Sequence, residues 1–170
     1  SIVELEKNFG LIAHRGPDHT DFKDFNGSAT LWFHRLAING LNNSSNQPMN
    51  LETSGGFLGL SKDPISDLWL VCNGEIYNHQ DLAEKYKVET TTGSDCEIIL
   101  HLFHKIGMNR LCRELDGVFA FCLYDHKTKT MYSARDRYGV RPSFFGRNES
   151  TGELVISSEM KAMTKIVADV

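Results

Sequence analysis

Five short polar segments of the sequence carry residue types that bind charged or amide-containing ligands. They are residues 14–18 (HRGPD), 34–36 (HRL), 73–78 (NGEIYN), 93–95 (GSD) and 135–139 (RDRYG). Each stands beside an expected strand or helix start, and loops placed by a rigid scaffold are where binding residues concentrate. We therefore expect the functional site among these segments.

Three of the segments carry groups that suit the charges of an amino acid. The guanidinium of Arg35 could hold a carboxylate through two parallel hydrogen bonds, and Glu75 and Asp95 could accept hydrogen bonds from an ammonium group. Each has an ordinary alternative, because Arg35 could form a surface ion pair and Asp95 could interact with a helix dipole. Together they predict a receptor for a zwitterionic amino acid.

The dipeptide Asn73-Gly74 has two interpretations. Asn-Gly is a strong signal for a tight turn between antiparallel strands, and this is the more common use of the pair. Alternatively, the Asn73 amide and the Gly74 N–H could form an oxyanion hole, donating hydrogen bonds to a negatively charged oxygen. Residues 75–78 lead into a helix rather than a return strand, which keeps the second interpretation open.

The cysteines and histidines show no comparable pattern. The four cysteines are scattered and form no CxxC pair, which favours reduced thiols over a disulfide framework. Cys96, His101 and His104 lack the spacing of a metal site, so no metal is expected. Cys96 lies in the first turn of an expected helix, where a thiol pKa can fall, but it has no neighbouring base. The cysteines are Cys72, Cys96, Cys112 and Cys122.

The composition is that of an ordinary globular chain. Its 170 residues fit one domain, and 41% hydrophobic and 24% charged residues are typical values. The net charge of −4 is spread along the chain, which argues against nucleic acid or a membrane as partner. We see neither a signal peptide nor an apolar run of the roughly 20 residues that a membrane span needs. We therefore expect a cytoplasmic protein.

The hydrophobic pattern predicts the elements that would position these residues. Helices are expected at residues 2–12, 94–105, 109–115 and 158–166, the second with a capping box between Ser94 and Glu97. Strands are expected at 29–35, 68–72, 118–124, 130–135, 144–147 and 153–157, and a long loop at 39–56. Because strands and helices come in groups rather than in alternation, we expect an α+β fold with antiparallel sheets.

Taken in order, these motifs resemble the class II glutamine amidotransferases, which are glutaminase domains with an N-terminal nucleophile. The resemblance covers about residues 12–161. Within that family, Pro17-Asp18 favours the asparagine synthetases. So do residues 73–79 (NGEIYNH), 115–121 (LDGVFAF), 138–142 (YGVRP) and 158–162 (SEMKA), while residues 33–37 and 68–70 look closest to the animal-type enzymes.

The resemblance implies a four-layer αββα sandwich of the N-terminal-nucleophile hydrolase type. It also implies that an N-terminal cysteine thiolate attacks the side-chain amide of glutamine, with its own α-amine as base. Glutamate and ammonia are the products, and Asn73 and Gly74 would hold the oxyanion. The residues that bind L-glutamine would be Arg35, Leu36, Ile38, Asn73, Gly74, Glu75 and Asp95.

The sequence departs from the family pattern at its ends and in the expected pocket. The family's Met-Cys-Gly-Ile start lies farther upstream of the HRGPD motif than the residues before His14 allow. We therefore expect residues 1–170 to be a glutaminase domain without its first strand and nucleophile, inactive alone. The family's C-terminal synthetase domain, which uses ATP and Mg to amidate aspartate, would be the partner that receives ammonia. No cofactor is expected within residues 1–170, and a homodimer is a compatible assembly. Residues 39–40 and 143–145 also differ from the usual ones.

Two other hypotheses remain. One is a catalytically inactive relative that keeps the fold as a binding or scaffolding module, as in the β-lactam-forming enzymes. Such a domain should have lost the oxyanion and carboxylate-binding residues, yet Arg35, Asn73 and Gly74 are present. The other is a different class II amidotransferase, against which Pro17-Asp18 argues. We therefore favour the glutaminase domain of a glutamine-hydrolysing asparagine synthetase.

Overall fold

The computed structural model describes residues 2–38, 42–50 and 67–167. Its elements in chain order are α1 (Ile2–Phe9), the 3₁₀ helix η1 (Gly10–Arg15), β1 (His19–Asp24), β2 (Thr30–Arg35), the 3₁₀ helix η2 (Asn43–Ser45), β3 (Met49–Asn50), β4 (Leu68–Ile76), α2 (His79–Tyr86), α3 (Glu97–Glu114), β5 (Gly117–Asp125), β6 (Thr130–Arg135), β7 (Phe144–Arg147), β8 (Leu154–Ser157) and the 3₁₀ helix η4 (Met160–Ala162).

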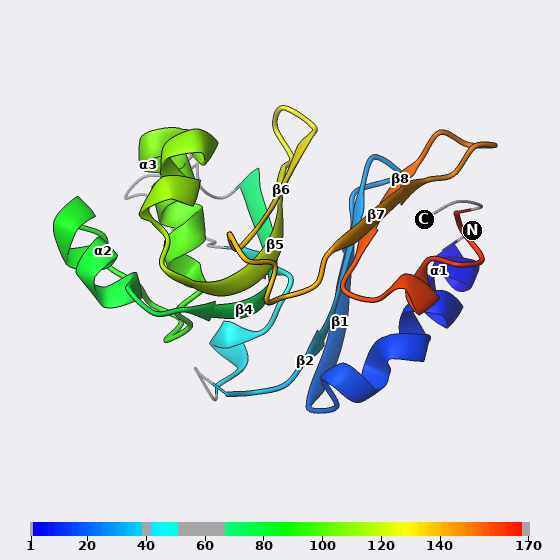
Figure 1. The fold of residues 1–170 in the computed structure, drawn as a ribbon, viewed down its shortest axis with the longest axis horizontal. Coiled ribbons are helices and arrows are strands. Elements are labelled where there is room, and N and C mark those ends of the chain that lie inside the picture. The colour runs from blue at the N-terminus through cyan, green and yellow to red at the C-terminus, as the bar shows by residue number, and fades with distance from the viewer. Residues whose placement is uncertain (1, 39–41, 51–66, 168–170) are drawn as a thin grey trace, which may run out of the picture.

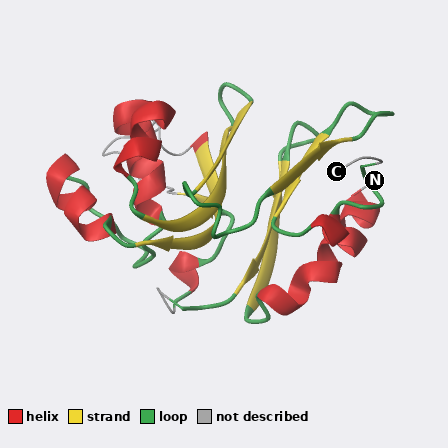
Figure 2. Ribbon diagram, viewed as in Figure 1, coloured by secondary structure: helices red, strands yellow, loops and turns green. Residues whose placement is uncertain are grey.

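The described strands pair antiparallel throughout. They form a four-stranded sheet in the order β3-β4-β5-β6 and two hairpins, β1-β2 and β7-β8. Figure 1 shows four layers: helices α2 and α3, the four-stranded sheet, the two hairpins, and α1 with the C-terminal turns. Helices thus cover the outer faces, and strands form the two inner layers (Figure 2). This is the α+β architecture with αββα layering that the resemblance implied.

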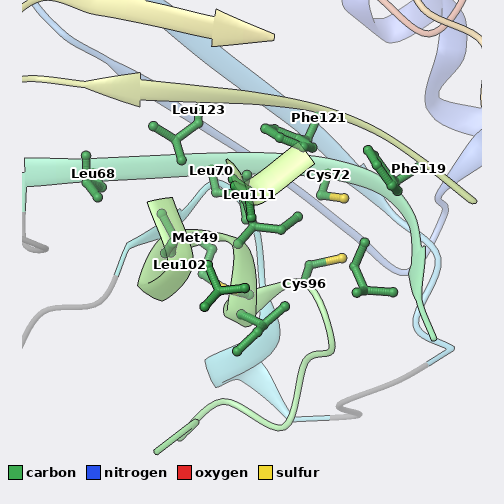
Figure 3. Close-up of a cluster of buried hydrophobic side chains, with 14 of the residues drawn as sticks. Met49, Leu68, Leu70, Cys72, Cys96, Leu102, Leu111, Phe119, Phe121 and Leu123 are labelled. Carbon is green, nitrogen blue, oxygen red and sulfur yellow. The ribbon is translucent and has the colours of Figure 1, made fainter. Parts of the chain in front are cut away.

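The main hydrophobic core fills the space between the four-stranded sheet and α3. Leu70 of β4, Leu123 of β5 and Leu102 of α3 are fully buried there (Figure 3), and each such side chain contributes about 1.5–3 kcal/mol by leaving water. On the other face of β4, Trp69 and Val71 pack against a second cluster, formed by Phe25, Leu31 and Tyr124. Strand β4 is therefore buried on both faces, as its apolar sequence predicted.

Most expected elements are confirmed. Strands β2, β5, β6, β7 and β8 lie within a residue of their predicted bounds. The two helices expected at 94–105 and 109–115 form one element, α3, which is broken by non-helical backbone at Gly107 (φ 70°). The first expected helix is present as α1 and continues as η1.

Several local predictions were wrong. Strand β1 was missed because its sequence is polar and mostly exposed, so it lacks the alternation that marks a half-buried strand. The expected loop at 39–56 contains η2 and β3, and its residues 39–41 and 51–56 lie outside the described residues. The C-terminal helix is only the short η4, because Glu159 is extended and bonds Arg15 of η1 instead.

The structure also excludes the turn interpretation of Asn73-Gly74. Strand β4 continues through both residues to Ile76, paired with β5. Gly74 allows this because the two backbones approach closely at this point. A Cβ atom at Gly74 would lie 2.2 Å from the Val118 carbonyl oxygen and 2.5 Å from the Phe119 Cα.

We expect Gly74→Ala to lower the free energy of unfolding by about 3 kcal/mol, since overpacking against backbone cannot be relieved by a rotamer change. Urea unfolding followed by circular dichroism measures the effect. Gly10→Ala is the matched control, because a Cβ there meets no atom within 4 Å. Equal stability changes in the two variants would contradict the close approach of β4 and β5.

Candidate functional site

A pocket of about 230 Å³ opens between β2 and β4. Side chains 69 and 71 of β4 face the hairpin layer, so the alternation of a strand turns Asn73 and Glu75 to that side too. Arg35 shares a face of β2 with Leu31, which belongs to the same inter-layer cluster. The pocket brings together all seven residues that the sequence predicted: Arg35, Leu36, Ile38, Asn73, Gly74, Glu75 and Asp95.

One edge of β4 presents the Gly74 N–H to the pocket. The Gln47 side chain bonds both main-chain groups of Cys72, accepting from its N–H at 2.6 Å and donating to its carbonyl at 3.2 Å. Further along β4, on the same edge, the Ile76 N–H donates to Asp95 Oδ2 at 2.6 Å. Main-chain groups alternate between the edges of an antiparallel strand. The Gly74 N–H therefore lies on this same edge, between the Gln47 and Asp95 side chains.

The Asn73 side chain presents a second donor. It lines the pocket, and its Nδ2 is buried without a hydrogen-bond partner among the described residues. A buried amide donor without a partner costs about 1–3 kcal/mol, and such groups in a folded protein usually await a ligand or a water molecule. The Asn73 amide and the Gly74 N–H are thus two donors that adjacent residues of β4 bring to the pocket.

Arg35 is held rigidly in the pocket wall. Its side chain is only 7% exposed, and its Nη1 donates to the Asn42 carbonyl at 3.2 Å and to Asn46 Oδ1 at 2.5 Å. A buried guanidinium with this support is not the surface ion-pair arginine that the sequence left open. It supplies a fixed positive charge, which suits a carboxylate.

Two acidic side chains face the same space. Asp95 is buried, and its Oδ2 accepts the Ile76 N–H, whereas its Oδ1 accepts no hydrogen bond within the described part of the chain. Glu75 is half-buried and also lines the pocket. Leu36 and Ile38 form the exposed rim, and the stretch between them is held where the Ala37 N–H donates to Asp18 Oδ2 at 2.8 Å.

The sequence did not single out several residues that build the pocket. Ser45, Asn46 and Gln47 come from the expected loop, and their signal was the run of amide and hydroxyl side chains at 42–47. Arg141 lines the pocket, and its Nε is buried without a partner among the described residues. Its loop is fixed by Asp136, whose carboxylate accepts the N–H groups of Phe119, Tyr138, Val140 and Arg141.

The two thiols that line the pocket are buried. Cys72 and Cys96 line it and meet in the core behind it (Figure 3). A hydrogen bond with Cys72, together with burial, raises the pKa of Cys96 well above its usual value, so the thiol stays protonated at neutral pH. The same holds for Cys122, whose pKa burial raises to about 11.

The described residues contain no group of three or more histidine, cysteine or acidic side chains placed to hold a metal ion. None of their helices has the length and apolar character needed to cross a membrane.

Among the described carboxylates near the pocket, Glu97 has the most strongly shifted pKa. It is fully buried and bonds Thr91, Thr92 and His101, so the capping box expected with Ser94 does not form. Burial alone would raise the pKa of Glu97. Hydrogen bonds from His101, Thr92 and Thr91 outweigh burial and lower this pKa to about 2, from 4.5.

This shift predicts an acid-sensitive fold. A carboxylate whose pKa is lower in the folded than in the unfolded state stabilises the fold above the unfolded pKa. We expect Glu97 to contribute about 3 kcal/mol at neutral pH, lost as the pH falls from about 4.5 towards 2. Urea unfolding at a series of pH values measures this. Glu97→Gln should flatten the curve over that range, and an unchanged slope in this variant would contradict the assignment.

Comparison with known proteins identifies the family of the chain. The family model of the glutamine amidotransferase domain matches residues 3–169. The chain therefore belongs to the glutamine amidotransferase domain family.

Among its relatives are asparagine synthetases. The chain is 36% identical over 170 residues to a putative asparagine synthetase (glutamine-hydrolyzing) 2 of Methanocaldococcus jannaschii, covering 96% of this chain and 32% of that protein. It is 40% identical over 157 residues to the asparagine synthetase (glutamine-hydrolyzing) of Mesocricetus auratus, and 39% to that of Homo sapiens. Both matches cover 91% of this chain and 26% of the relative. The chain thus spans a third or less of the length of these relatives.

Proposed function

We propose that the pocket binds L-glutamine and that the side-chain amide of glutamine is hydrolysed there to glutamate and ammonia. The observation that carries this proposal is the buried Asn73 Nδ2, which has no partner among the described residues and lies beside Gly74. An amide donor kept unpaired next to a backbone N–H is arranged for an oxygen that becomes negative during reaction.

The remaining groups match the other end of glutamine. Arg35 would bind the α-carboxylate, and Glu75 and Asp95 would bind the α-ammonium group. The side chain would then extend towards Asn73 and Gly74, whose donors suit the tetrahedral oxyanion. Leu36 and Ile38 would cover the substrate from the rim.

The attacking thiol is not one of the four cysteines. Cys72 and Cys96 reach the pocket only as buried thiols, and the raised pKa of Cys96 keeps that thiol protonated. In the family that the motifs resemble, the thiol belongs to an N-terminal cysteine whose own α-amine takes the proton. We propose that the pocket is the receptor for glutamine beside a thiol of that kind.

We further propose that the ammonia is used for the ATP-dependent amidation of aspartate in a partner synthetase domain. The relatives that share this domain are named glutamine-hydrolyzing asparagine synthetases and are about three to four times as long. ATP and Mg would act in that partner, and we assign no residue of this chain to them.

The protein expressed from its complete coding sequence tests both proposals. Glutamate should form from glutamine, and asparagine should form when aspartate and ATP are added. Asparagine formed from ammonium salts but never from glutamine would contradict the glutaminase assignment. Glutamate formed without any asparagine would contradict only the synthetase partner.

The chemistry of the thiols supports a reducing compartment. All four cysteines are free, as is usual in proteins that remain in the cytosol. We therefore propose a cytoplasmic location, and cell fractionation with a compartment marker tests it.

A further inference from the structure

Glu97 lies just outside the pocket, in the apolar core. Its neighbours Ile98 and Ile99 are fully buried, and so is Glu97 itself. Taking a carboxylate out of water is costly, and well-packed apolar residues can often replace a buried charge without loss of stability. The groups that this carboxylate binds give the reason for its presence.

The Glu97 carboxylate accepts hydrogen bonds from two consecutive residues of the loop before α3. The Thr91 N–H donates to its two oxygens at 2.8 and 3.0 Å. The Thr92 N–H and hydroxyl both donate to Oε2, at 2.7 and 2.6 Å. Hydrogen bonds to an ionised acceptor are about twice as strong as neutral ones, so residues 91–92 are firmly fixed to α3.

Thr92 in turn holds the segment that supports Arg35. Its carbonyl accepts hydrogen bonds from the Ser45 hydroxyl at 2.6 Å and the Ser44 hydroxyl at 3.3 Å. The next residue, Asn46, accepts from the Arg35 guanidinium at 2.5 Å. The Asn42 carbonyl, at the other end of η2, accepts from the same nitrogen. Residues 42–46 therefore hold the Arg35 guanidinium in place.

We propose that Glu97 is a positioning residue for glutamine binding, acting on Arg35 through Thr92 and Ser45. The proposal rests on the proposed function, in which Arg35 binds the substrate carboxylate. A neutral side chain at position 97 would not hold the two N–H groups and the Thr92 hydroxyl together through hydrogen bonds to one acceptor group. At metal sites, replacing a residue that orients a ligand by a hydrogen bond typically changes affinity or activity 10–100-fold, and we expect an effect at the lower end of that range here.

A cycle of variants tests this connection through the Kd for L-glutamine. Glu97→Gln and Ser45→Ala should each weaken binding about tenfold. The Kd of the double variant should be at most about twice the larger of the two single-variant Kd values, because both changes break the same connection. Leu111→Ala is the control for lost stability, since Leu111 is fully buried in α3 and lies outside the pocket. Its Kd should be unchanged.

Hydrogen exchange gives a second readout that needs no ligand. The Ser45 and Asn46 amides donate within their own segment, to the carbonyls of Asn42 and Asn43. In Glu97→Gln they should exchange about tenfold faster, and in Leu111→Ala at the wild-type rate after correction for global stability. A wild-type chain that does not bind glutamine would contradict the proposed function. The exchange rates of the Ser45 and Asn46 amides would then be the only test of whether Glu97 positions this segment.

Two results would overturn the positioning role. One is a Glu97→Gln variant that loses stability as Leu111→Ala does but keeps the wild-type affinity and exchange rates. The other is a double variant in which the two tenfold losses multiply, because independent effects exclude a shared connection.

Discussion

Replacing Arg35 by alanine should weaken L-glutamine binding about 100-fold. The substitution removes a buried cation that the proposed complex pairs with the substrate carboxylate. Charge-assisted hydrogen bonds contribute about 1.5–3 kcal/mol each, and 1.4 kcal/mol corresponds to a factor of ten in Kd. Titration calorimetry of the wild-type and variant chains measures the loss. Asparagine synthesis from ammonium salts by the complete protein should survive, since that route needs no glutamine.

Arg147→Ala is the matched control for this prediction. Arg147 is an exposed guanidinium on β7, outside the pocket, so its removal should leave the Kd for glutamine unchanged. Simultaneous loss of glutamine-dependent and ammonia-dependent synthesis in Arg35→Ala would show that Arg35 does more than bind glutamine. A Kd within threefold of wild type would remove Arg35 from the site.

Asn73→Ala should lower the turnover number of glutamine hydrolysis by roughly 10²–10³, the usual cost of one oxyanion donor. The KM for glutamine should change little, because the oxyanion exists only during reaction and the ground-state amide gains less from this donor. Glutamate release by the protein made from its complete coding sequence measures both constants. Because Asn73 Nδ2 has no partner among the described residues, its removal should not destabilise the fold.

The outcome decides whether Asn73 stabilises the oxyanion. A tenfold or smaller decrease in turnover would mean that Asn73 has no electrostatic role in the reaction. Asn148→Ala is the control, because the Asn148 side chain accepts the N–H groups of Ser150 and Thr151 in an exposed turn. Its turnover number should equal that of the wild type.

The residues proposed to contact the ligand were easier to predict than the ones that hold them. Arg35, Glu75 and Asp95 carry their chemistry in their side chains, so residue type and neighbourhood pointed to them. Asn73-Gly74 was harder, since a local turn preference favoured the wrong conformation. The pairing of β4 with β5 overrides that preference, and pairing between distant segments is not a property of the local sequence.

The support of Arg35 could not be predicted from local patterns. Ser45 and Thr92 are 47 residues apart in sequence. Glu97 even suggested a different local role, because Ser94 and Glu97 fit a capping box. The carboxylate instead bonds Thr91 and Thr92, whose N–H groups the folded loop presents to it. Only the three-dimensional arrangement shows that a core carboxylate and a pocket arginine belong to one connection.

Stereospecific binding of glutamine is the most direct test of the pocket as an amino-acid receptor. Titration calorimetry of the chain with L-glutamine should show saturable binding at one site, which D-glutamine does not reproduce. In the proposed complex Arg35, Glu75 and Asp95 would fix the carboxylate and the ammonium group together, so the mirror-image ligand could not place its side chain towards Asn73 and Gly74. Equal affinity for the two enantiomers, or no binding of L-glutamine, would contradict the proposed receptor.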